Sequence, residues 1–385
     1  MKSLIAGWGH TRFGRLDGSL EDLIQDAARE ALADAGISAA DVDAVWLGNF
    51  NAGMVPDGFC ASMILGADDA LRFKPATRCE NACASGSAAL YAAMDAIASG
   101  RVKVALVVGA EKMTAVDGAT VTRALGAASY QKEEAGMSFP QIFAEFAKAY
   151  AAKYTDPLDA MAVIASKNHH AAMGNPYAQL RKPLSVEFCR EVSDKNPLIA
   201  PPLKMTDCSL VSDGAAAIVL MREDMARDVK RAVGFRAAVQ VNDFLPLSRK
   251  DPVAFEGPRR AFDAAYAMAG VSVGDISFAE VHDCFTIAEL LAVEAMGLAR
   301  PGEGVAAVLA GKTQRDGVLP VNMSGGLKAK GHPVGATGVS MHVIAAKQLT
   351  GEAGDMQLPD PKLGMVFNMG GGAVANYVSI LERVR

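Results

Sequence analysis

Apolar residues recur with the period of a helix in some segments of the chain and form short continuous runs in others. Helical spacing extends from Leu20 to Leu32 and ends before Gly36. Ser19 and Asp22 have the spacing of a capping box at its start. The short apolar runs predict buried strands at residues 4–7, 42–47, 102–108, 276–281 and 365–367. Because strands that are apolar on both faces need helices on each side, the pattern predicts an α/β fold.

The same succession of elements occurs a second time. Helical spacing returns at residues 261–268, Gly270 ends it, and the strand predicted at 276–281 follows. The segments that connect this helix to the following strand also match in sequence. Residues 35–42 contain Ala-Gly-Ile-Ser, two residues, then Asp-Val, and residues 269–276 contain Ala-Gly-Val-Ser, two residues, then Asp-Ile. An internal repeat of such long period predicts a duplicated two-half structure and not a solenoid.

A long interruption separates the two predicted halves. Residues 112–207 contain prolines, tyrosines, a His-His pair and a methionine-rich helical segment, which predicts an inserted loop domain. A strand starting near Ser212 then completes the first half, which consists of residues 1–111 and 208–231. The second half comprises residues 232–385.

Composition and charge exclude several classes of function. Of the 385 residues, 51% are hydrophobic and 21% are charged, as in a globular protein with a large core. The net charge is −5 and no Lys/Arg run occurs, so no nucleic-acid or anionic-membrane surface is expected. No segment reaches about 18 continuous apolar residues, and the apolar run at the N-terminus is too short for a signal peptide. We therefore expect a cytoplasmic protein without a membrane span.

Six cysteines are present, and none belongs to a Cys-x-x-Cys pair. In a reducing compartment neither a disulfide framework nor a metal site is predicted. Most of these thiols are expected to pack as small buried hydrophobes, namely Cys60, Cys79, Cys189 and Cys208. His169 and His170 are expected to be solvated, because adjacent residues of a helix do not share a face.

Cys83 is the first candidate for chemistry. It lies in the string Asn-Ala-Cys-Ala-Ser-Gly, which opens a helix of small residues at 84–93. A thiol at a helix N-terminus feels unpaired amides and the positive end of the dipole, so its pKa is expected to fall from roughly 8.5 toward neutrality. The alternative is an inert cysteine buried in an alanine-rich helix.

His332 occupies a matching turn in the second half. It lies in Gly-His-Pro-Val-Gly-Ala-Thr-Gly at residues 331–338, and both His332 and Cys83 stand three residues before a glycine. Duplicated halves pack about a pseudo-twofold axis, which would bring the two helix N-termini together and let His332 take the thiol proton. The alternatives are a plain tight loop or, given the glycine density, a phosphate cradle. Without a Gly-Lys-Ser/Thr string or a Rossmann fingerprint, dinucleotide binding is not predicted.

Three strings together resemble the thiolase superfamily over nearly the whole chain. They are the cysteine segment, Ser-Asp-Gly-Ala-Ala-Ala at residues 212–217, and the glycine-rich string around His332, which is the most specific. The resemblance implies a duplicated, five-layered α-β-α-β-α fold, with the inserted loop domain on the side of the substrate and CoA. It also implies an enzyme that cleaves or forms 3-ketoacyl-CoA through an acyl-cysteine, with Cys83 as nucleophile and His332 as its activating base.

Two segments depart from the commonest thiolase pattern. Most thiolases carry a second cysteine, the acid/base, before a Gly-Gly-Gly turn, whereas this chain has Asn368, whose amide cannot shuttle a proton at neutral pH. The usual Asn-Glu-Ala-Phe loop is replaced by His-Asp-Cys-Phe at residues 282–285, which is similar to the sterol-carrier-protein type of thiolase. By that resemblance Cys284 is the acid/base and His282 holds an oxyanion-hole water. Taken alone, Cys284 would be a core thiol, and Asp283 could either orient His282 or cap the helix that follows.

The resemblance also assigns contacts, cofactors and partners. It implies an oxyanion hole made by the backbone amides of Cys83 and Gly370, and contacts to CoA from Ser209 and, near the phosphates, from Arg181. Coenzyme A is expected as a substrate, with no tightly bound cofactor and no metal. A homodimer or tetramer is expected, and some members of this branch need a small OB-fold, zinc-ribbon companion subunit.

Three functions are compatible with these residues. The first is a thiolase acting on a CoA thioester through Cys83, His332 and Cys284. The second keeps the acyl-cysteine but changes the outcome, to a ketoacyl synthase, a retro-aldolase subunit or an acyltransferase on a non-CoA acceptor, with His282 and Asn368 mimicking the His/Asn pair of ketoacyl synthases. The third is a non-catalytic acyl-CoA- or lipid-binding protein, or a subunit that is active only with a partner. The glycine-rich string favours the first.

Overall fold

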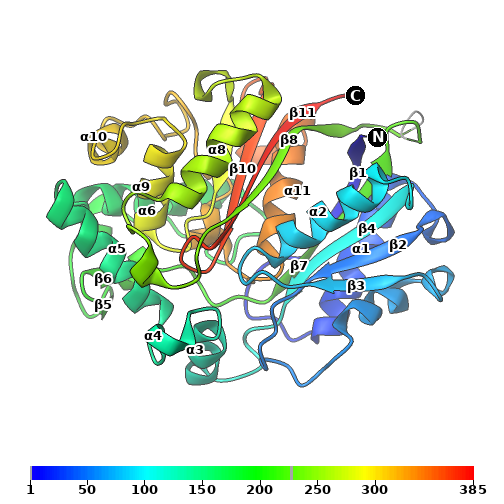
Figure 1. Cartoon of the computed structure of the whole chain (residues 1–385), viewed down its shortest axis with the longest axis horizontal. Coiled ribbons are helices and arrows are strands. Elements are labelled where there is room, and N and C mark those ends of the chain that lie inside the picture. Colours follow the sequence, from blue (N-terminus) through cyan, green and yellow to red (C-terminus); the bar gives the residue numbers. More distant parts are fainter. Residues whose placement is uncertain (1, 226–228) are drawn as a thin grey trace.

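The computed structural model describes residues 2–225 and 229–385, and its secondary structure is mixed α/β (Figure 1). The strands are β1 (Ser3–His10), β2 (Ala44–Gly48), β3 (Ala76–Cys79), β4 (Val104–Glu111), β5 (Leu198–Ala200), β6 (Leu203–Lys204), β7 (Gly214–Arg222), β8 (Val233–Asn242), β9 (Phe278–Val281), β10 (Leu363–Gly370) and β11 (Ala375–Arg383). The helices are α1 (Leu20–Ala35), α2 (Ser85–Ala98), α3 (Gly118–Gly126), α4 (Gln131–Glu134), α5 (Phe139–Lys153), α6 (Leu158–Ala171), α7 (Val186–Arg190), α8 (Glu256–Ala269), α9 (Thr286–Ala295), α10 (Gly304–Leu309) and α11 (Thr337–Thr350).

The order of the strands shows that the fold is duplicated. The large sheet has the order β3-β2-β4-β7-β1-β8-β11-β10-β9. In the first half β2 and β4 pair in parallel, and β4, β7 and β1 then pair antiparallel. In the second half β9, β10, β11 and β8 repeat these directions in the same order. The halves meet where Leu4 and Ile5 of β1 pair with Gly234 and Val233 of β8. The predicted duplication is therefore confirmed.

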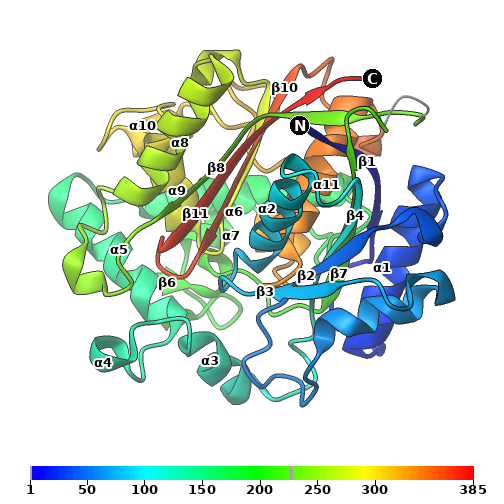
Figure 2. The ribbon, with the colours of Figure 1, turned by 45° about the vertical axis from the view of Figure 1, so that its right-hand side comes forward.

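Helices cover the outer faces of the two halves and fill the space between them. α1 contacts β1 and β7 on the outer side of the first half, and α8 contacts β8 and β11 on the outer side of the second. α2 and α11 contact each other between the halves, where α2 packs on β2 and β4 and α11 packs on β10 (Figure 2). This arrangement is the predicted five-layered α-β-α-β-α fold.

The matching segments between helix and strand, residues 35–42 and 269–276, have the same local structure in both halves. Gly36 ends α1 and Gly270 ends α8, each with a φ of 67°, a conformation that favours glycine. A 3₁₀ turn with a capping box follows each glycine, at Ala39–Asp41 and Val273–Asp275. The capping box predicted at Ser19 is also present at the start of α1. Each predicted strand overlaps a strand of the structure, so the local pattern was sufficient to locate these elements.

The crossing of α2 and α11 depends on glycine. A Cβ atom on Gly86 would lie 2.8 Å from the carbonyl oxygen of Gly335, and one on Gly338 would lie 2.3 Å from the amide nitrogen of Ser87. Neither distance leaves room for a side chain, so the two helices approach backbone to backbone. The turns immediately before these helices are thereby held close together.

The segment predicted as an insertion forms α3 to α7 and the small β5–β6 sheet. Its helix α6 contacts α7, α9 and α10. On this helix His169 is buried, whereas His170 is exposed. The prediction that both histidines are solvated was therefore wrong for His169. Its Nδ1 lies 3.0 Å from the carbonyl oxygen of Lys182, and burial lowers its pKa to about 4. Within the described residues, no helix combines the length and the apolar character needed to cross a membrane.

Candidate active site

A cavity opens beside the turns that precede α2 and α11. It encloses about 800 Å³, including the part of its mouth that is open to solvent. Cys83, Cys284 and His332 line it, and so does Cys208, which was predicted to be a packing residue. Most of the remaining wall is apolar and consists of Met113, Val121, Leu125, Phe139, Pro140, Leu210, Val211, Phe285 and Val334. The cavity can hold an apolar acyl group next to a thiol.

Three segments that are far apart in the sequence place the reactive side chains. Cys83 precedes α2, His332 precedes α11, and His282 and Cys284 lie between β9 and α9. The sulfur of Cys83 and one ring nitrogen each of His282 and His332 lie within 4.8 Å of one another. The two imidazole rings are nearly perpendicular, with centroids 5.1 Å apart and an interplanar angle of 85°. The structure thus brings Cys83 and His332 together, as the duplicated turns predicted.

The hydrogen bonds of His332 leave one ring nitrogen free. Its Nδ1 lies 2.7 Å from the hydroxyl of Thr337, which donates its only hydrogen to the carbonyl oxygen of Pro333 at 3.0 Å. Thr337 can therefore only accept from the ring, so the ring hydrogen is on Nδ1. Nε2 carries the lone pair, is buried, and has no hydrogen-bond partner in the described part of the chain. Burial, and then the charge of Lys330, lower the pKa of His332 to about 3, so the ring is neutral.

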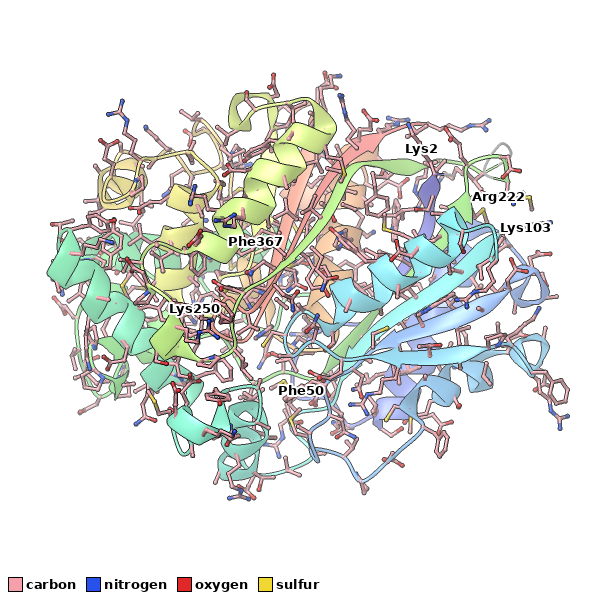
Figure 3. The ribbon with its side chains drawn as sticks, in the orientation of Figure 1. Lys2, Phe50, Lys103, Arg222, Lys250 and Phe367 are labelled. Atoms are coloured by element: carbon pink, nitrogen blue, oxygen red, sulfur yellow. The ribbon has the colours of Figure 1, made fainter. Side chains whose placement is uncertain are left out.

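The main chain of the His332 turn is fixed by Ser212 and Glu111. The amide N–H of His332 donates to Ser212 Oγ at 3.0 Å. Glu111, at the end of β4, accepts N–H groups from both halves, namely the side chain of Asn49 and the amides of Phe50 (labelled in Figure 3), Asn51 and Gly335. Burial raises the pKa of Glu111 to about 7. Glu111 was not predicted as a site residue from the sequence. It could have been found as a carboxylate at the end of an otherwise apolar strand.

The pKa of Cys83 differs from the sequence prediction. Burial raises it to about 12, although backbone N–H groups of Gly371 and of Cys83 itself lower it. Because α2 begins at Ser85, two residues after the thiol, the helix N-terminus does not offset the loss of solvent. The prediction of a near-neutral pKa was therefore wrong. Since His332 is neutral as well, the resting pair is a thiol and an imidazole and not an ion pair.

The rate of Cys83 alkylation is expected to rise steadily with pH. A thiol with a pKa of about 12 is only ~10⁻⁵ thiolate at pH 7, and this fraction grows about tenfold with each pH unit. Iodoacetamide labelling of the free protein between pH 6 and pH 9, with mass spectrometry of the Cys83 peptide, measures the rate. A rate that levels off below pH 8 would contradict the prediction and indicate a thiolate–imidazolium pair.

The other predicted site residues differ in how close they lie to the cavity. Ser209 lines it, and its amide donates to the carbonyl oxygen of Cys284 at 2.9 Å. Cys284 is buried, and burial raises the pKa of its thiol well above the usual value. Gly371 lines the cavity, whereas Gly370 is the last residue of β10 beside it. Arg181 is exposed outside the lining, and its guanidinium donates to a main-chain carbonyl of the same segment at 2.8 Å.

Asp283 takes neither of the two roles considered from the sequence. Its carboxylate accepts the amide N–H of Leu327 at 2.6 Å and that of Lys328 at 3.2 Å. It also accepts the side-chain amide of Asn168 at 2.8 Å. Leu327 and Lys328 belong to the π-turn Gly326–Lys330, which comes directly before the His332 turn. The carboxylate therefore links the two loops that carry the active-site histidines.

Comparison with known proteins agrees with this geometry. The family model described as the thiolase N-terminal domain matches residues 3–196, and the one described as thiolase C-terminal domain-like matches residues 240–383. An acetyl-CoA acetyltransferase from Methanothermobacter thermautotrophicus is 39% identical over 384 residues, covering 98% of this chain and 99% of the relative. The chain belongs to the thiolase family.

Further relatives of this thiolase include the sterol-carrier-protein branch. Sterol carrier protein 2 from Oryctolagus cuniculus is 32% identical over 399 residues, covering 96% of this chain and 70% of the relative. A solved structure described as Ltp2-ChsH2(DUF35) aldolase has a TM-score of 0.85 at 23% identity and covers 100% of this chain and 98% of that chain, a likeness of fold. The resemblance predicted from the sequence motifs is confirmed, and the protein is a thiolase-type acyltransferase.

Proposed function

We propose that this thiolase is CoA-dependent and cleaves or forms a 3-ketoacyl-CoA through an acyl-Cys83 intermediate. The observation that carries the proposal is the neutral ring of His332, which has a buried Nε2 without a hydrogen-bond partner among the described residues and a ring nitrogen within 4.8 Å of the Cys83 sulfur. A base without another partner beside a nucleophile is the arrangement that covalent catalysis requires. The acetyl-CoA acetyltransferases among the relatives support a CoA thioester as substrate.

In the first half-reaction His332 takes the proton of Cys83 as the sulfur attacks the keto carbon. Proton transfer in step with attack suits a pair that is neutral at rest. The amides of Cys83 and Gly370, with that of Gly371 next in the same turn, stabilise the oxyanion, and each such donor contributes roughly 3 kcal/mol. The carbon–carbon bond then breaks and releases the enolate of a CoA thioester.

Cys284 moves the proton in the two steps that follow, the protonation of the enolate and the attack of CoA on the acyl-enzyme. The oxygen of the enolate is stabilised by His332 and, through a water, by His282, while the thiol of Cys284 protonates its carbon. Free CoA then gives its proton to the Cys284 thiolate and attacks the acyl group on Cys83, and His332 returns its proton to the departing sulfur. The reverse sequence is a Claisen condensation. Because the two half-reactions are separate, ping-pong kinetics are expected.

Intact-mass spectrometry tests the proposal directly. The protein is mixed with a panel of CoA thioesters, from acetyl-CoA and acetoacetyl-CoA to longer and aromatic acyl groups. The expected result is an acyl adduct on Cys83 that disappears when free CoA is added. The same panel identifies the preferred acyl group. If no member of the panel acylates Cys83, the proposal fails.

We also propose that this thiolase is a homodimer or tetramer. The proposal is supported by β3, which is the last strand of the large sheet on one side and has exposed residues at Thr77 and Arg78. Phe59 and Phe73, which are 91% and 85% exposed, lie in the segments before this strand. An open strand edge beside exposed apolar side chains is suited to pairing with another chain. Light scattering of the purified protein tests this, and a monomer at micromolar concentration would refute it.

A second candidate keeps the acyl-cysteine but requires a small OB-fold, zinc-ribbon companion subunit. It is supported by the solved structure described as Ltp2-ChsH2(DUF35) aldolase, whose description names two components and whose matched chain covers all of this chain. Adduct formation and turnover are compared for the chain alone and for the chain mixed with the product of a neighbouring small gene. Full turnover without the second protein would exclude this candidate.

A further inference from the structure

Asn368 lies in the active site, at the position where most thiolases carry a second catalytic cysteine. It belongs to β10 and is fully buried. Its side chain contacts three groups: the hydroxyl of Ser87, the main-chain carbonyl of Cys83 and the ring Nδ1 of His282. It therefore joins the nucleophile turn of the first half to the histidine loop of the second.

Two of these contacts fix the orientation of the amide. The carbonyl oxygen of Cys83 can only accept, so the group 3.2 Å from it is Nδ2 of Asn368. The other amide atom, Oδ1, accepts from the hydroxyl of Ser87 at 2.8 Å. Nδ2 consequently also faces Nδ1 of His282, at 2.9 Å. Because an NH₂ group only donates, Nδ1 of His282 carries the lone pair and the ring hydrogen is on Nε2.

The neighbouring histidine has the opposite arrangement. Thr337 places the hydrogen of His332 on Nδ1, which leaves the lone pair on Nε2. Burial lowers the pKa of both rings and keeps them neutral, and only in a neutral ring does the tautomer decide what each nitrogen can do. The two perpendicular imidazoles beside Cys83 therefore offer one acceptor and one donor.

We propose that Asn368 is a positioning residue that holds His282 as the Nε2–H tautomer. In this form His282 donates a hydrogen bond toward the developing enolate and does not compete with His332 for the proton of Cys83. The inference rests on the thiolase reaction proposed above. Where most thiolases have a cysteine that moves a proton, this chain has an amide that selects the direction of a hydrogen bond.

The same tautomer argues against metal binding at this cluster. Cys83, His282 and His332 are ligand types for zinc, and their ligand atoms lie within 4.8 Å of one another. However, coordination through Nε2 of His282 would move the ring hydrogen to Nδ1, where the NH₂ group of Asn368 offers no acceptor, and Nδ1 itself already accepts from that NH₂ group. The amide thus keeps the cluster available for acyl transfer.

Nitrogen NMR of the full chain measures the tautomer directly. The protein is labelled with ring-¹⁵N histidine, and His282→Gln assigns the His282 signals in long-range ¹H–¹⁵N spectra. We expect Nε2 of His282 to be protonated and Nδ1 to be unprotonated at pH 7, with the reverse for His332. The isosteric variant Asn368→Asp places an acceptor beside the ring and should bring a hydrogen onto Nδ1. A wild-type His282 with hydrogen on Nδ1 would overturn the proposal.

Kinetics separate a positioning role from a structural one. Exchange of an acyl group between acyl-CoA and labelled CoA passes through acyl-Cys83 without an enolate, whereas cleavage of a 3-ketoacyl-CoA forms one. Asn368→Leu, which removes the donor, should lower cleavage roughly 100-fold more than it lowers exchange, since about 100-fold is the usual effect of losing one oxyanion donor and the bond to the Cys83 turn is lost for both reactions. Equal losses in both reactions would overturn the proposal.

A matched control and the wild type complete the design. Asn376→Leu removes another fully buried asparagine from the adjacent strand β11, away from both histidines, and should change the two rates in parallel. If the wild type shows neither exchange nor an adduct on Cys83, the proposed function fails. In that case the NMR result still decides the tautomer of His282 by itself.

Discussion

Replacing Cys83 by alanine is expected to abolish acyl transfer, with turnover falling by roughly 10⁴-fold or more. The reason is that both half-reactions pass through the same sulfur, so no alternative route remains once it is lost. His332 would keep the free lone pair on Nε2, but the Cys83 thiol that it deprotonates would be gone. The measurement combines turnover of a 3-ketoacyl-CoA with the intact mass of the protein after exposure to acyl-CoA.

The matched control for this experiment is Cys208→Ala. Cys208 lines the same cavity, but its thiol donates a hydrogen bond to the carbonyl oxygen of Lys204 at 3.4 Å and is not part of the cluster with the two histidines. This variant should still form the adduct and should retain activity within about an order of magnitude. Persistent acylation of Cys83→Ala at Cys208 or Cys284 would show that the nucleophile has been assigned to the wrong thiol.

The second large effect is expected from Gly338→Val. A Cβ atom at this position would lie 2.3 Å from the amide nitrogen of Ser87 and 2.6 Å from Oδ1 of Asn368. The backbone of α2 cannot move away without displacing the nucleophile turn, so the substitution should destabilise the fold by about 3 kcal/mol or more and eliminate activity. Thermal unfolding and turnover of the purified variant measure the two effects.

The control for Gly338→Val is Gly58→Ala, a substitution at a glycine that lies outside the crossing of α2 and α11. A Cβ atom there meets no atom within 4 Å, so stability and activity should stay close to the wild-type values. A Gly338→Val protein that unfolds at the wild-type temperature and turns over normally would mean that α2 and α11 do not need this close approach.

Much of the fold could be predicted because its determinants are local. The glycines at 36 and 270, the capping boxes and the apolar strand runs act over a few residues, and they recur in the same order in both halves. Duplication also explains why Cys83 and His332 could be paired over a separation of some 250 residues. Two equivalent turns related by a pseudo-twofold axis meet at its centre.

The protonation states could not be predicted, because they depend on groups from distant segments. The pKa of Cys83 is set by enclosure in a cavity wall, which outweighs the nearby helix terminus that the sequence reveals. His169 is buried beside the carbonyl oxygen of Lys182 and near the charge of Lys328, and no local pattern places these groups against α6. The role of Asn368 depends on a hydroxyl and a carbonyl from the other half of the chain. The sequence shows an asparagine within an apolar strand, but it does not show how the amide of that asparagine is oriented.

The position of β7 has a consequence for synthesis of the chain. This strand lies between β4 and β1 in the sheet, yet in sequence the whole insertion separates it from β4, and β1 lies earlier still. A ribosome working at about 5–20 residues per second needs roughly 6 to 22 s to proceed from residue 111 to residue 222. Throughout that interval the facing edges of β1 and β4 have no partner and can pair with other nascent chains. Pairing of β7 with both strands is therefore expected to be a late step in the folding of the first half, after the insertion has been synthesised.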